Sequence, residues 1–393
     1  MTPRGEIFFG WKVVAAAFVV ALFGWGFGFY GPSLYLAEIS RRLAWPTSIV
    51  SAAITGYYLL GALGIALVGE AFARLGALRV VLGAWCAMAL AVAGLTAVTQ
   101  TWQVFAAFAL MSLGWAGMSA AAVNNIIAPW FDAKRGMAVS WALNGATCGG
   151  IVVLPLLVLL TETLGWRAGL LAALAFASLI LAPTAFAYLR RVPGELPPPA
   201  EAEREEAPAR LRSDLAFWTI TVPVALSLLA QVGFLIHQIA IARTVVDARG
   251  AALAVAVTTG IALLSRIGLS FVIDRLDARN AIAWLCILQA AALASFAWSP
   301  SAQTLYVASA LFGVAVGNLI TLPALVVQRE FAARRFARII SAVWSSAQVT
   351  FAFGPLLLGA LRDYTGSYFV PLVACMAAEL LAAGVVRVRR PPR

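Results

Sequence analysis

Residues 251–274 read AALAVAVTTGIALLSRIGLSFVID, an apolar run interrupted by a single arginine, Arg266. A helix of about 20 apolar residues crosses the ~30 Å hydrocarbon core of a bilayer, so this stretch is predicted to span a membrane. Of the 28 Lys and Arg residues, only Arg266 falls inside a predicted span rather than at an end. A charge at mid-bilayer costs about 2.5–3.5 kcal/mol on insertion scales and usually faces a polar cavity or a partner. Arg266 is therefore the first candidate for a functional side chain.

The rest of the chain has the same character. Apolar residues make up 62% of the 393 residues and charged residues 11%, and the mean hydropathy is +0.91. Such a composition excludes a water-soluble enzyme and indicates an all-α polytopic membrane protein. Twelve spans are predicted, at 11–37, 47–72, 78–98, 103–129, 137–162, 167–189, 215–242, 251–273, 280–298, 303–327, 337–361 and 367–386.

The basic residues predict the orientation. Both termini and the even-to-odd loops carry 21 Lys and Arg residues, whereas the opposite side carries six. The positive-inside rule then places both termini in the cytoplasm. Because the basic residues are scattered over short loops, nucleic acid is not expected as a partner. The arginine-rich, lysine-poor and alanine-rich composition is typical of a GC-rich bacterial genome, which predicts an inner membrane.

The chain is predicted to consist of two similar halves. Phe131-Asp-Ala-Lys134-Arg135 recurs 200 residues later as Phe331-Ala-Ala-Arg-Arg335, and the Arg74 to Arg79 stretch recurs as Arg275 to Arg279. Three matches at nearly one offset, Gly165 and Gly366 included, indicate two parallel six-helix repeats. Residues 191–214 are rich in proline and charge and are predicted to be a cytoplasmic linker between halves at 1–190 and 215–393.

This architecture resembles that of the major facilitator superfamily along nearly the whole chain. The superfamily signature in the loop between helices 2 and 3 is present in altered form as Gly69-Glu-Ala-Phe-Ala73-Arg74-Leu-Gly76, and its second copy keeps Asp274-Arg275. The resemblance implies that Gly69, Arg74, Lys134, Arg135, Asp274 and Arg275 belong to loop motifs at the cytoplasmic gate. It also implies alternating access, in which two halves expose one midplane site to each side in turn.

Further motifs resemble the bacterial branch of the monocarboxylate porter family, which also contains the oxalate:formate exchanger. They are Phe9-Gly10-Trp11, Trp130-Phe131 with Lys134-Arg135-Gly136 and Asn144-Gly145, Gly165-Trp166-Arg167, Leu215-Ala-Phe217-Trp218 and Ser265-Arg266. In that family the helix 8 arginine anchors the substrate carboxylate, and Arg266 has its position. A guanidinium also offers a planar fork of donors that matches a carboxylate. A small organic anion is therefore the expected substrate.

The sequence departs from the family at three places. Ala262 stands where animal members have an aspartate one turn before the arginine, and residues 26–30 lack their helix 1 lysine. The exchanger's second cation in helix 11 is replaced within Trp344-Ser-Ser-Ala-Gln348. One cavity cation favours a monocarboxylate, since a second buried carboxylate would lack a charge partner. The coupling ion stays open between a proton and a counter-anion.

His237, Asn125 and Asn124 are the next candidates for substrate binding. His237 is either a second donor or a proton-titrating group, or else a neutral histidine bonded to a backbone carbonyl. The two asparagines are adjacent, so they point about 100° apart on a helix, and Asn125 matches an asparagine of the oxalate exchanger. The alternative for both is hydrogen bonding between helices.

The remaining candidates lie within spans but carry weaker signals. For substrate binding they are Tyr30, Tyr57, Gln231, Asn318, Trp344 and Gln348. Glu379 in the last span is a coupling candidate; it is alternatively protonated, directed toward Arg387, or bonded to the span at 303–327 or 337–361. The Gly-rich stretches at 24–28 and 145–150 are expected to permit close helix packing.

No cofactor, metal site or enzyme activity is expected, because one histidine and four isolated cysteines give no ligand spacing. For Arg266, an ion pair with Asp274 is the alternative, although about 12 Å of helical rise separates the two residues. The competing function is export of neutral or cationic solutes by the same fold. A monomer is the default for this architecture.

Overall fold

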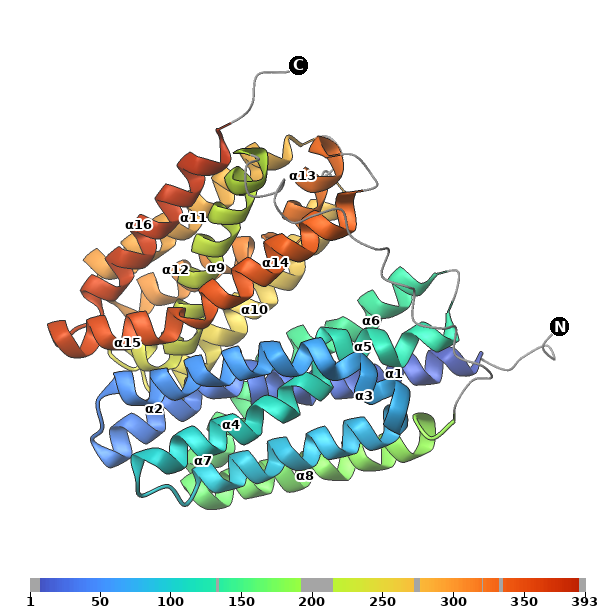
Figure 1. The fold of residues 1–393 in the computed structure, drawn as a ribbon. Helices are drawn as coiled ribbons and strands as arrows, with labels where there is room; N and C mark the ends of the chain where they lie inside the picture. Colours follow the sequence, from blue (N-terminus) through green and yellow to red (C-terminus); the bar gives the residue numbers. More distant parts are fainter. Residues whose placement is uncertain are drawn as a thin grey trace. The chain divides into compact units, whose positions relative to one another are not determined.

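The computed structural model describes residues 8–131, 134–191, 215–271, 276–319, 321–331 and 335–388. Within these ranges every secondary-structure element is a helix (Figure 1). The first half of the chain forms α1 (Phe9–Trp25), the π-helical η1 (Gly26–Tyr30), α2 (Gly31–Leu43), α3 (Thr47–Leu95), α4 (Thr101–Met118), α5 (Ala120–Ile127), η2 (Ala128–Trp130), α6 (Arg135–Cys148), the π-helical η3 (Gly149–Val153), α7 (Leu154–Leu164) and α8 (Trp166–Tyr188).

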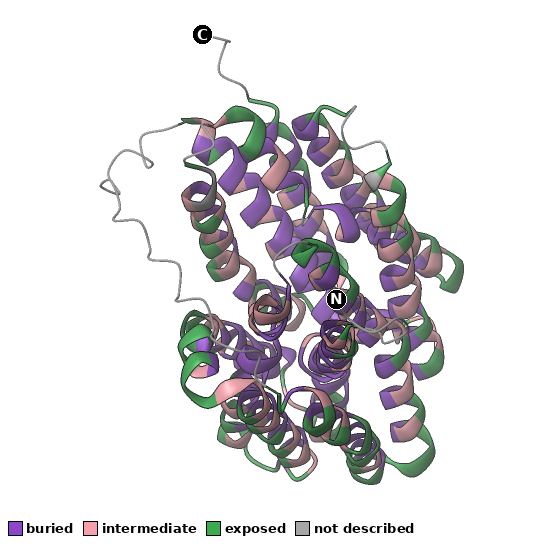
Figure 2. Cartoon of the chain, turned by 90° about the vertical axis from the view of Figure 1, so that its right-hand side faces the viewer, coloured by how far each residue is buried: buried purple, intermediate pink, exposed green. Residues whose placement is uncertain are grey.

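The second half forms eight helices in the described ranges. They are α9 (Leu215–Ala242), α10 (Ala248–Ser270), α11 (Ala278–Trp298), α12 (Ala302–Asn318), α13 (Leu322–Glu330), α14 (Phe336–Ala352), α15 (Gly354–Thr365) and α16 (Phe369–Val386). Buried and exposed positions lie on different sides of the same helices (Figure 2).

Eleven helical stretches of the described residues are long and apolar enough to cross a membrane. One of them, α3, has 49 residues and would be about 73 Å long as a continuous helix, more than twice the hydrocarbon thickness. It is interrupted at Gly76, whose φ of 76° and ψ of 161° are not helical. Gly76 falls between the predicted spans 47–72 and 78–98, so α3 supplies two of the twelve predicted crossings.

The chain divides into two compact units. Unit 1 comprises Met1–Tyr35 and Gly56–Glu201, and unit 2 comprises Leu36–Thr55 and Ala202–Arg393. Residues 36–55 thus pack with the second half of the chain, whereas the sequence assigned them to the first. The division at the linker stays a prediction, and residues 192–214 of that linker lie outside the described residues.

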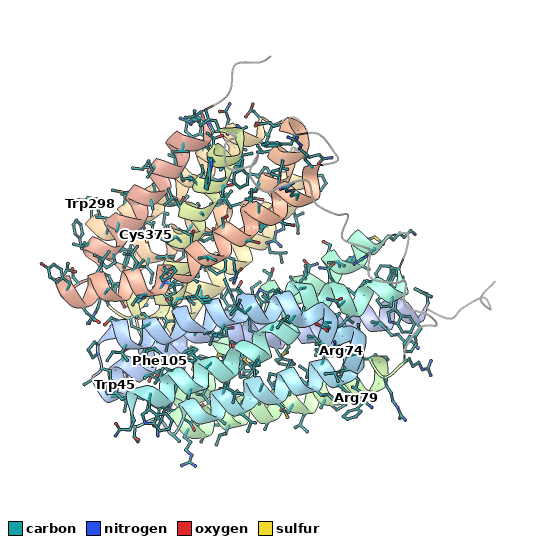
Figure 3. The ribbon with its side chains drawn as sticks, in the orientation of Figure 1. Trp45, Arg74, Arg79, Phe105, Trp298 and Cys375 are labelled. Atoms are coloured by element: carbon teal, nitrogen blue, oxygen red, sulfur yellow. The ribbon has the colours of Figure 1, made fainter. Side chains whose placement is uncertain are left out.

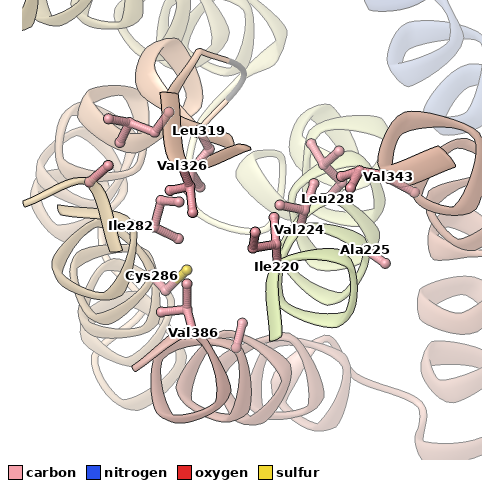
Figure 4. Close-up of a cluster of buried hydrophobic side chains, with 14 of the residues drawn as sticks. Ile220, Val224, Ala225, Leu228, Ile282, Cys286, Leu319, Val326, Val343 and Val386 are labelled. Atoms are coloured by element: carbon pink, nitrogen blue, oxygen red, sulfur yellow. The ribbon is translucent and has the colours of Figure 1, made fainter. Parts of the chain in front are cut away.

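Unit 2 is built around α9. This helix packs against α14, α16, α15 and α10, and 83% of the residues in its most apolar stretch are buried. Figure 4 shows side chains of α9, α11, α13 and α16 directed at one another, among them Ile220, Ile282, Val326 and Val386. Such a helix is apolar on all sides because every side meets protein.

Glycines allow equivalent helices in both units to touch backbone to backbone. A Cβ on Gly149 of η3 would lie 2.8 Å from the amide nitrogen of Gly26 in η1. A Cβ on Gly354 of α15 would lie 2.9 Å from the amide nitrogen of Gly233 in α9. The close packing expected of the Gly-rich stretches at 24–28 and 145–150 is therefore confirmed.

Candidate functional site

Arg266 lies in α10 where this helix meets α12. Its side chain is half-buried, and Nε donates to the carbonyl oxygen of Gly317 at 3.0 Å. A Cβ on Gly317 would collide with the carbonyl oxygen of Ala262, and a Cβ on Gly313 with that of Thr258. The spacing Gly313-x-x-x-Gly317 therefore lets α12 approach α10 closely enough to orient the guanidinium group.

Asn318 and Ser265 lie at the same contact between α10 and α12. The Asn318 amide donates to Ser265 Oγ at 3.2 Å and to the Val314 carbonyl at 2.8 Å, and Ser265 Oγ donates to that carbonyl at 3.1 Å. Asn318 is 3% exposed, and within the described ranges its Oδ1 accepts no hydrogen bond. Two predicted site residues, Arg266 and Asn318, are thus brought together by one helix pair. The alternative partner of Arg266, Asp274, is outside the described residues.

His237 of α9 is fully buried in unit 2. Its Nε2 lies 2.9 Å from the Pro355 carbonyl oxygen and 3.3 Å from Ser51 Oγ, and Nδ1 lies 3.2 Å from the Tyr368 hydroxyl. A carbonyl only accepts, so Nε2 carries the hydrogen directed at Pro355. The Tyr368 hydroxyl can then donate to Nδ1 of a neutral ring. The bond to a backbone carbonyl is the alternative that the sequence left open for this histidine.

Gln231 and Glu379 also contact neighbouring helices of unit 2. Gln231 Oε1 accepts from the Gln289 amide at 3.1 Å. Glu379 is fully buried, and Ser227 Oγ lies 3.0 and 2.9 Å from its two carboxyl oxygens. Ser227 belongs to α9, whereas one of the alternatives from the sequence was a bond to the span at 303–327 or 337–361. Arg387 is not that partner either, because its guanidinium lies over the ring of Trp284 at 5.4 Å.

Trp344 and Gln348 are one turn apart on α14. Trp344 is half-buried and packs against the apolar core of unit 2, and Gln348 is half-buried as well. Their part in substrate binding stays a prediction.

Three of the candidate substrate-binding residues of unit 1 form hydrogen bonds to backbone carbonyls of unit 1. Asn124 and Asn125 donate to the carbonyls four residues earlier, Ala120 and Ala121, each at 2.9 Å. These are bonds within one helix, whereas the sequence alternative was a bond between helices. The buried Tyr57 donates to the carbonyl of Gly28 at 2.6 Å.

Aromatic rings gather around Tyr57 in unit 1. The ring centroids of Trp25 and Trp115 are 4.9 Å apart, and those of Tyr57 and Trp115 are 6.4 Å apart. Tyr30, half-buried, has its ring 5.1 Å from that of Phe29, which in turn stacks on Trp115. This set, Trp25, Phe29, Tyr30, Tyr57, Tyr58 and Trp115, is called the aromatic cluster below.

The predicted loop motifs are exposed where they are described. Gly69 and Arg74 lie before the kink in α3, and Arg74, which is labelled in Figure 3, pairs with Glu70. Lys134, with a left-handed φ of 65°, and Arg135 begin α6. Asp274 and Arg275 lie outside the described residues. The gate role of all six residues stays a prediction.

Sequence reasoning missed Arg279, a buried arginine of unit 2 with bonds to several helices. Its side chain is 3% exposed, and it bonds to both carboxyl oxygens of Glu330 at 2.6 and 2.7 Å and to the carbonyls of Thr219 and Val386. It therefore fastens the ends of α9, α13 and α16 to α11. The predicted span began at 280, one residue too late to include it.

Three charged residues at the opposite end of unit 2 were missed as well. Glu38 was left one residue outside the first predicted span, and Arg243 and Asp363 lie outside the predicted spans 215–242, 337–361 and 367–386. Glu38 is 3% exposed and pairs with Arg243, and Asp363 accepts bonds from the backbone of α3. Glu38 could have been identified from the sequence, because a carboxylate at the end of an apolar helix needs a partner.

Solved transporter structures share this fold. A bacterial homologue of the human lysosomal transporter Spinster, in an inward-facing and occupied conformation, aligns over 97% of both chains with 14% identity and a TM-score of 0.75. The nucleoside transporter NupG aligns over 97% of this chain and 98% of its own, with 14% identity and a TM-score of 0.74. A mutant of NupG gives 12% identity and a TM-score of 0.78 over 96% and 98% of the two chains. At these identities the likeness shows the fold alone.

Among curated proteins no match was found. The family model of the Major Facilitator Superfamily matches residues 16–355, most of the chain. With its helical architecture and its glycine-packed repeats, the chain belongs to the major facilitator superfamily and is a membrane transporter, not an enzyme.

Proposed function

We propose that this transporter carries a small organic anion, most specifically a monocarboxylate, with Arg266 as the carboxylate anchor. The observation that carries the proposal is the guanidinium group in the membrane-spanning helix α10, half-buried and oriented by the Gly317 carbonyl. A guanidinium group offers a planar fork of donors, which suits the two oxygens of a carboxylate.

The sequence of this chain supports a monoanion rather than a dicarboxylate as the substrate, at the position where the exchanger has its second cation. The stretch 344–348 holds Trp344 and Gln348 in place of a cation. A dicarboxylate would bring a second charge into the membrane, and burying a carboxylate without a cation costs several kcal/mol. A bound monocarboxylate would neutralise Arg266 and lower the barrier to reorientation. Exchange of one anion for another is then favoured over net movement.

Proton coupling is the alternative to exchange, and His237 and Glu379 are its candidates. Both side chains are fully buried. If either residue carries the coupled proton, His237→Asn or Glu379→Gln abolishes uptake driven by a pH gradient but preserves exchange at equal pH. Unchanged gradient-driven uptake in both variants favours anion exchange.

A thermal-shift screen of the purified protein tests the proposed substrate class. The ligands are lactate, pyruvate, oxalate, aromatic acids and typical drug cations. A ligand at about 100 times its Kd stabilises the folded state by about 2.7 kcal/mol. We expect a monocarboxylate to raise the unfolding temperature of the wild type and to have no effect on Arg266→Gln. Failure of every carboxylate to stabilise the wild type would contradict the proposal.

The second candidate function is export of neutral or cationic solutes. The aromatic cluster favours it, because half-buried rings such as Trp25 and Phe29 bind planar or cationic molecules by stacking. In the same screen, stabilisation by the drug cations, retained in Arg266→Gln and lost in Trp115→Ala, would favour this second function.

A further inference from the structure

Asn318 is the last residue of α12, at the point where this membrane span is interrupted. The helix ends at Asn318, and α13 begins at Leu322. In a continuous helix the Gly317 carbonyl would accept from the amide of Thr321, but that amide donates to the Asn318 carbonyl at 3.0 Å. The Gly317 carbonyl instead accepts from Nε of Arg266 at 3.0 Å. The interruption therefore places the end of α12 beside the proposed carboxylate anchor.

The orientation of the Asn318 amide is fixed by its partners. Its Nδ2 donates to the Val314 carbonyl at 2.8 Å and to Ser265 Oγ at 3.2 Å. A carbonyl only accepts, so the nitrogen and not the oxygen faces Val314. The oxygen and nitrogen of an amide lie on opposite sides of Cγ, and Val314 lies one turn before Asn318. Oδ1 is therefore directed toward the C-terminal end of α12, where Gly317 contacts Arg266.

Oδ1 of Asn318 is a buried acceptor without a donor. Asn318 is 3% exposed, and within the described residues no group donates to its Oδ1. A buried acceptor that lacks a donor is destabilising, so a ligand that supplies the donor gains affinity. The guanidinium group of Arg266 at the same helix end disfavours a metal ion or an ammonium group there, because like charges repel. A neutral hydroxyl group is the donor that fits.

We infer that Asn318 is a specificity-determining residue, which selects a monocarboxylate with a hydroxyl group next to its carboxylate. This inference rests on the proposed function, because it takes Arg266 as the carboxylate anchor. The hydroxyl group donates to Asn318 Oδ1 while the carboxylate binds Arg266. An oxo group at the same carbon is a second acceptor facing Oδ1, and an unsubstituted carbon leaves Oδ1 without a donor. Hydroxy acids are therefore selected over oxo acids and over unsubstituted acids.

Acids that share one carbon chain test this selection in the wild-type protein. Lactate (both enantiomers), pyruvate and propionate are titrated calorimetrically into purified protein, and mandelate, phenylglyoxylate and phenylacetate form a second set with an aromatic ring. We expect the better enantiomer of the hydroxy acid to bind at least about tenfold more tightly than the other acids of its set. Burial of apolar surface alone predicts that the unsubstituted acid binds best. Equal or weaker binding of the hydroxy acid would overturn the inference.

Asn318→Leu tests whether Asn318 is the residue that selects. Leucine is close to asparagine in shape, and the Val314 carbonyl keeps a donor because Ser265 Oγ also donates to it, at 3.1 Å. We expect the variant to bind the unsubstituted acid within about threefold of the wild type and to lose the preference for the hydroxy acid. A preference that persists in Asn318→Leu would contradict the role of Asn318. The wild-type titrations decide the selection even where this variant does not fold.

Asn280→Leu is the matched control. Asn280 is exposed at the start of α11, where its backbone amide donates to Asp277 at 2.9 Å. We expect this variant to keep the wild-type preference for the hydroxy acid. Loss of the preference in both leucine variants would overturn the assignment to Asn318.

The titrations distinguish failure of this inference from failure of the proposed function. Binding of the acids without a preference for the hydroxyl group would overturn the role of Asn318 and leave Arg266 as the carboxylate anchor. Absence of binding by every acid of both sets would contradict the proposed function, and the inference with it.

Discussion

The buried polar side chains of the two units differ in kind. In the described parts of unit 1 they are serines and threonines, apart from tyrosine hydroxyls, and most bond to carbonyls of their own helix. In unit 2 they include amides, two carboxylates, a histidine and an arginine, and these bond between helices: Glu38, Gln231, His237, Gln238, Arg279, Gln289, Asn318 and Glu379. The two units therefore have similar helices but different kinds of buried polar side chains.

The glycine contacts show what the repeat has kept. Gly26 meets Gly149 in unit 1, and Gly233 meets Gly354 in unit 2, between corresponding helices. Backbone approach depends on a single small residue, so it persists while side chains around it diverge. Arg266 has no basic counterpart 200 or 201 residues earlier, where Ala66 and Ile65 stand. The proposed anion anchor, Arg266, is therefore a feature of unit 2 without a basic equivalent in unit 1.

The largest effect is expected from the arginine pair Arg79 and Arg279, which occupy equivalent positions of the repeat. Arg79 is exposed (Figure 3), whereas Arg279 is buried against Glu330 and two carbonyls. We expect Arg279→Leu to lower the stability by about 3 kcal/mol or more, because it strands the groups that the guanidinium satisfies. Arg79→Leu is expected to change it by less than about 0.5 kcal/mol. Thermal unfolding of the purified variants measures both changes in stability. Equal losses of stability in the two variants would contradict the expected difference between Arg79 and Arg279.

An intermediate effect is expected at the glycines of the α10–α12 pair. Gly317→Ala places a methyl group against the Ala262 carbonyl and is expected to cost about 1–3 kcal/mol. Gly260→Ala on α10 meets nothing within 4 Å and is expected to be neutral or to stabilise by up to about 1 kcal/mol. Thermal unfolding measures the stability of the two variants. Stabilisation by a bound ligand should be lost only in Gly317→Ala. A Gly317→Ala protein as stable as the wild type would contradict this prediction, because it would show that α10 and α12 leave room for a methyl group.

The smallest effect is expected in unit 1. Tyr57→Phe removes the hydrogen bond to the Gly28 carbonyl and is expected to cost about 1 kcal/mol while leaving anion binding intact. Tyr364→Phe is the control, because Tyr364 is 90% exposed and its loss should be undetectable. If Tyr57→Phe abolishes stabilisation by a carboxylate without changing the unfolding temperature, then Tyr57 contacts the substrate, as the sequence predicts, and the expectation that anion binding stays intact is wrong.

Much of the fold was predictable from the sequence, because membrane spans must be long, apolar and helical. The predicted span 215–242 coincides with α9, and the break between the second and third spans falls at Gly76. The errors lie at helix ends. The first span was ended at 37, although the helix continues through Glu38 to Leu43, since hydropathy alone does not register that an ion pair makes a buried acid tolerable.

The candidate site was predictable only in part. Arg266 and Asn318 were both identified as intramembrane polar residues, but their meeting depends on Gly313 and Gly317, whose role emerges only when α10 and α12 are placed together. The partners of His237 and Glu379 lie 118 to 186 residues away along the chain. A single sequence contains no signal for such pairings.

Counterflow in proteoliposomes loaded with unlabelled monocarboxylate tests the role of Arg266 most directly. Wild type, Arg266→Lys, Arg266→Gln and the exposed control Arg249→Gln are compared for uptake of the labelled acid that gives the largest thermal shift. We expect uptake by the wild type and the control, a reduction of at least about tenfold in Arg266→Lys because the planar fork is lost, and no uptake in Arg266→Gln. Uptake by Arg266→Gln at the wild-type rate would contradict the assignment of Arg266 as the carboxylate anchor.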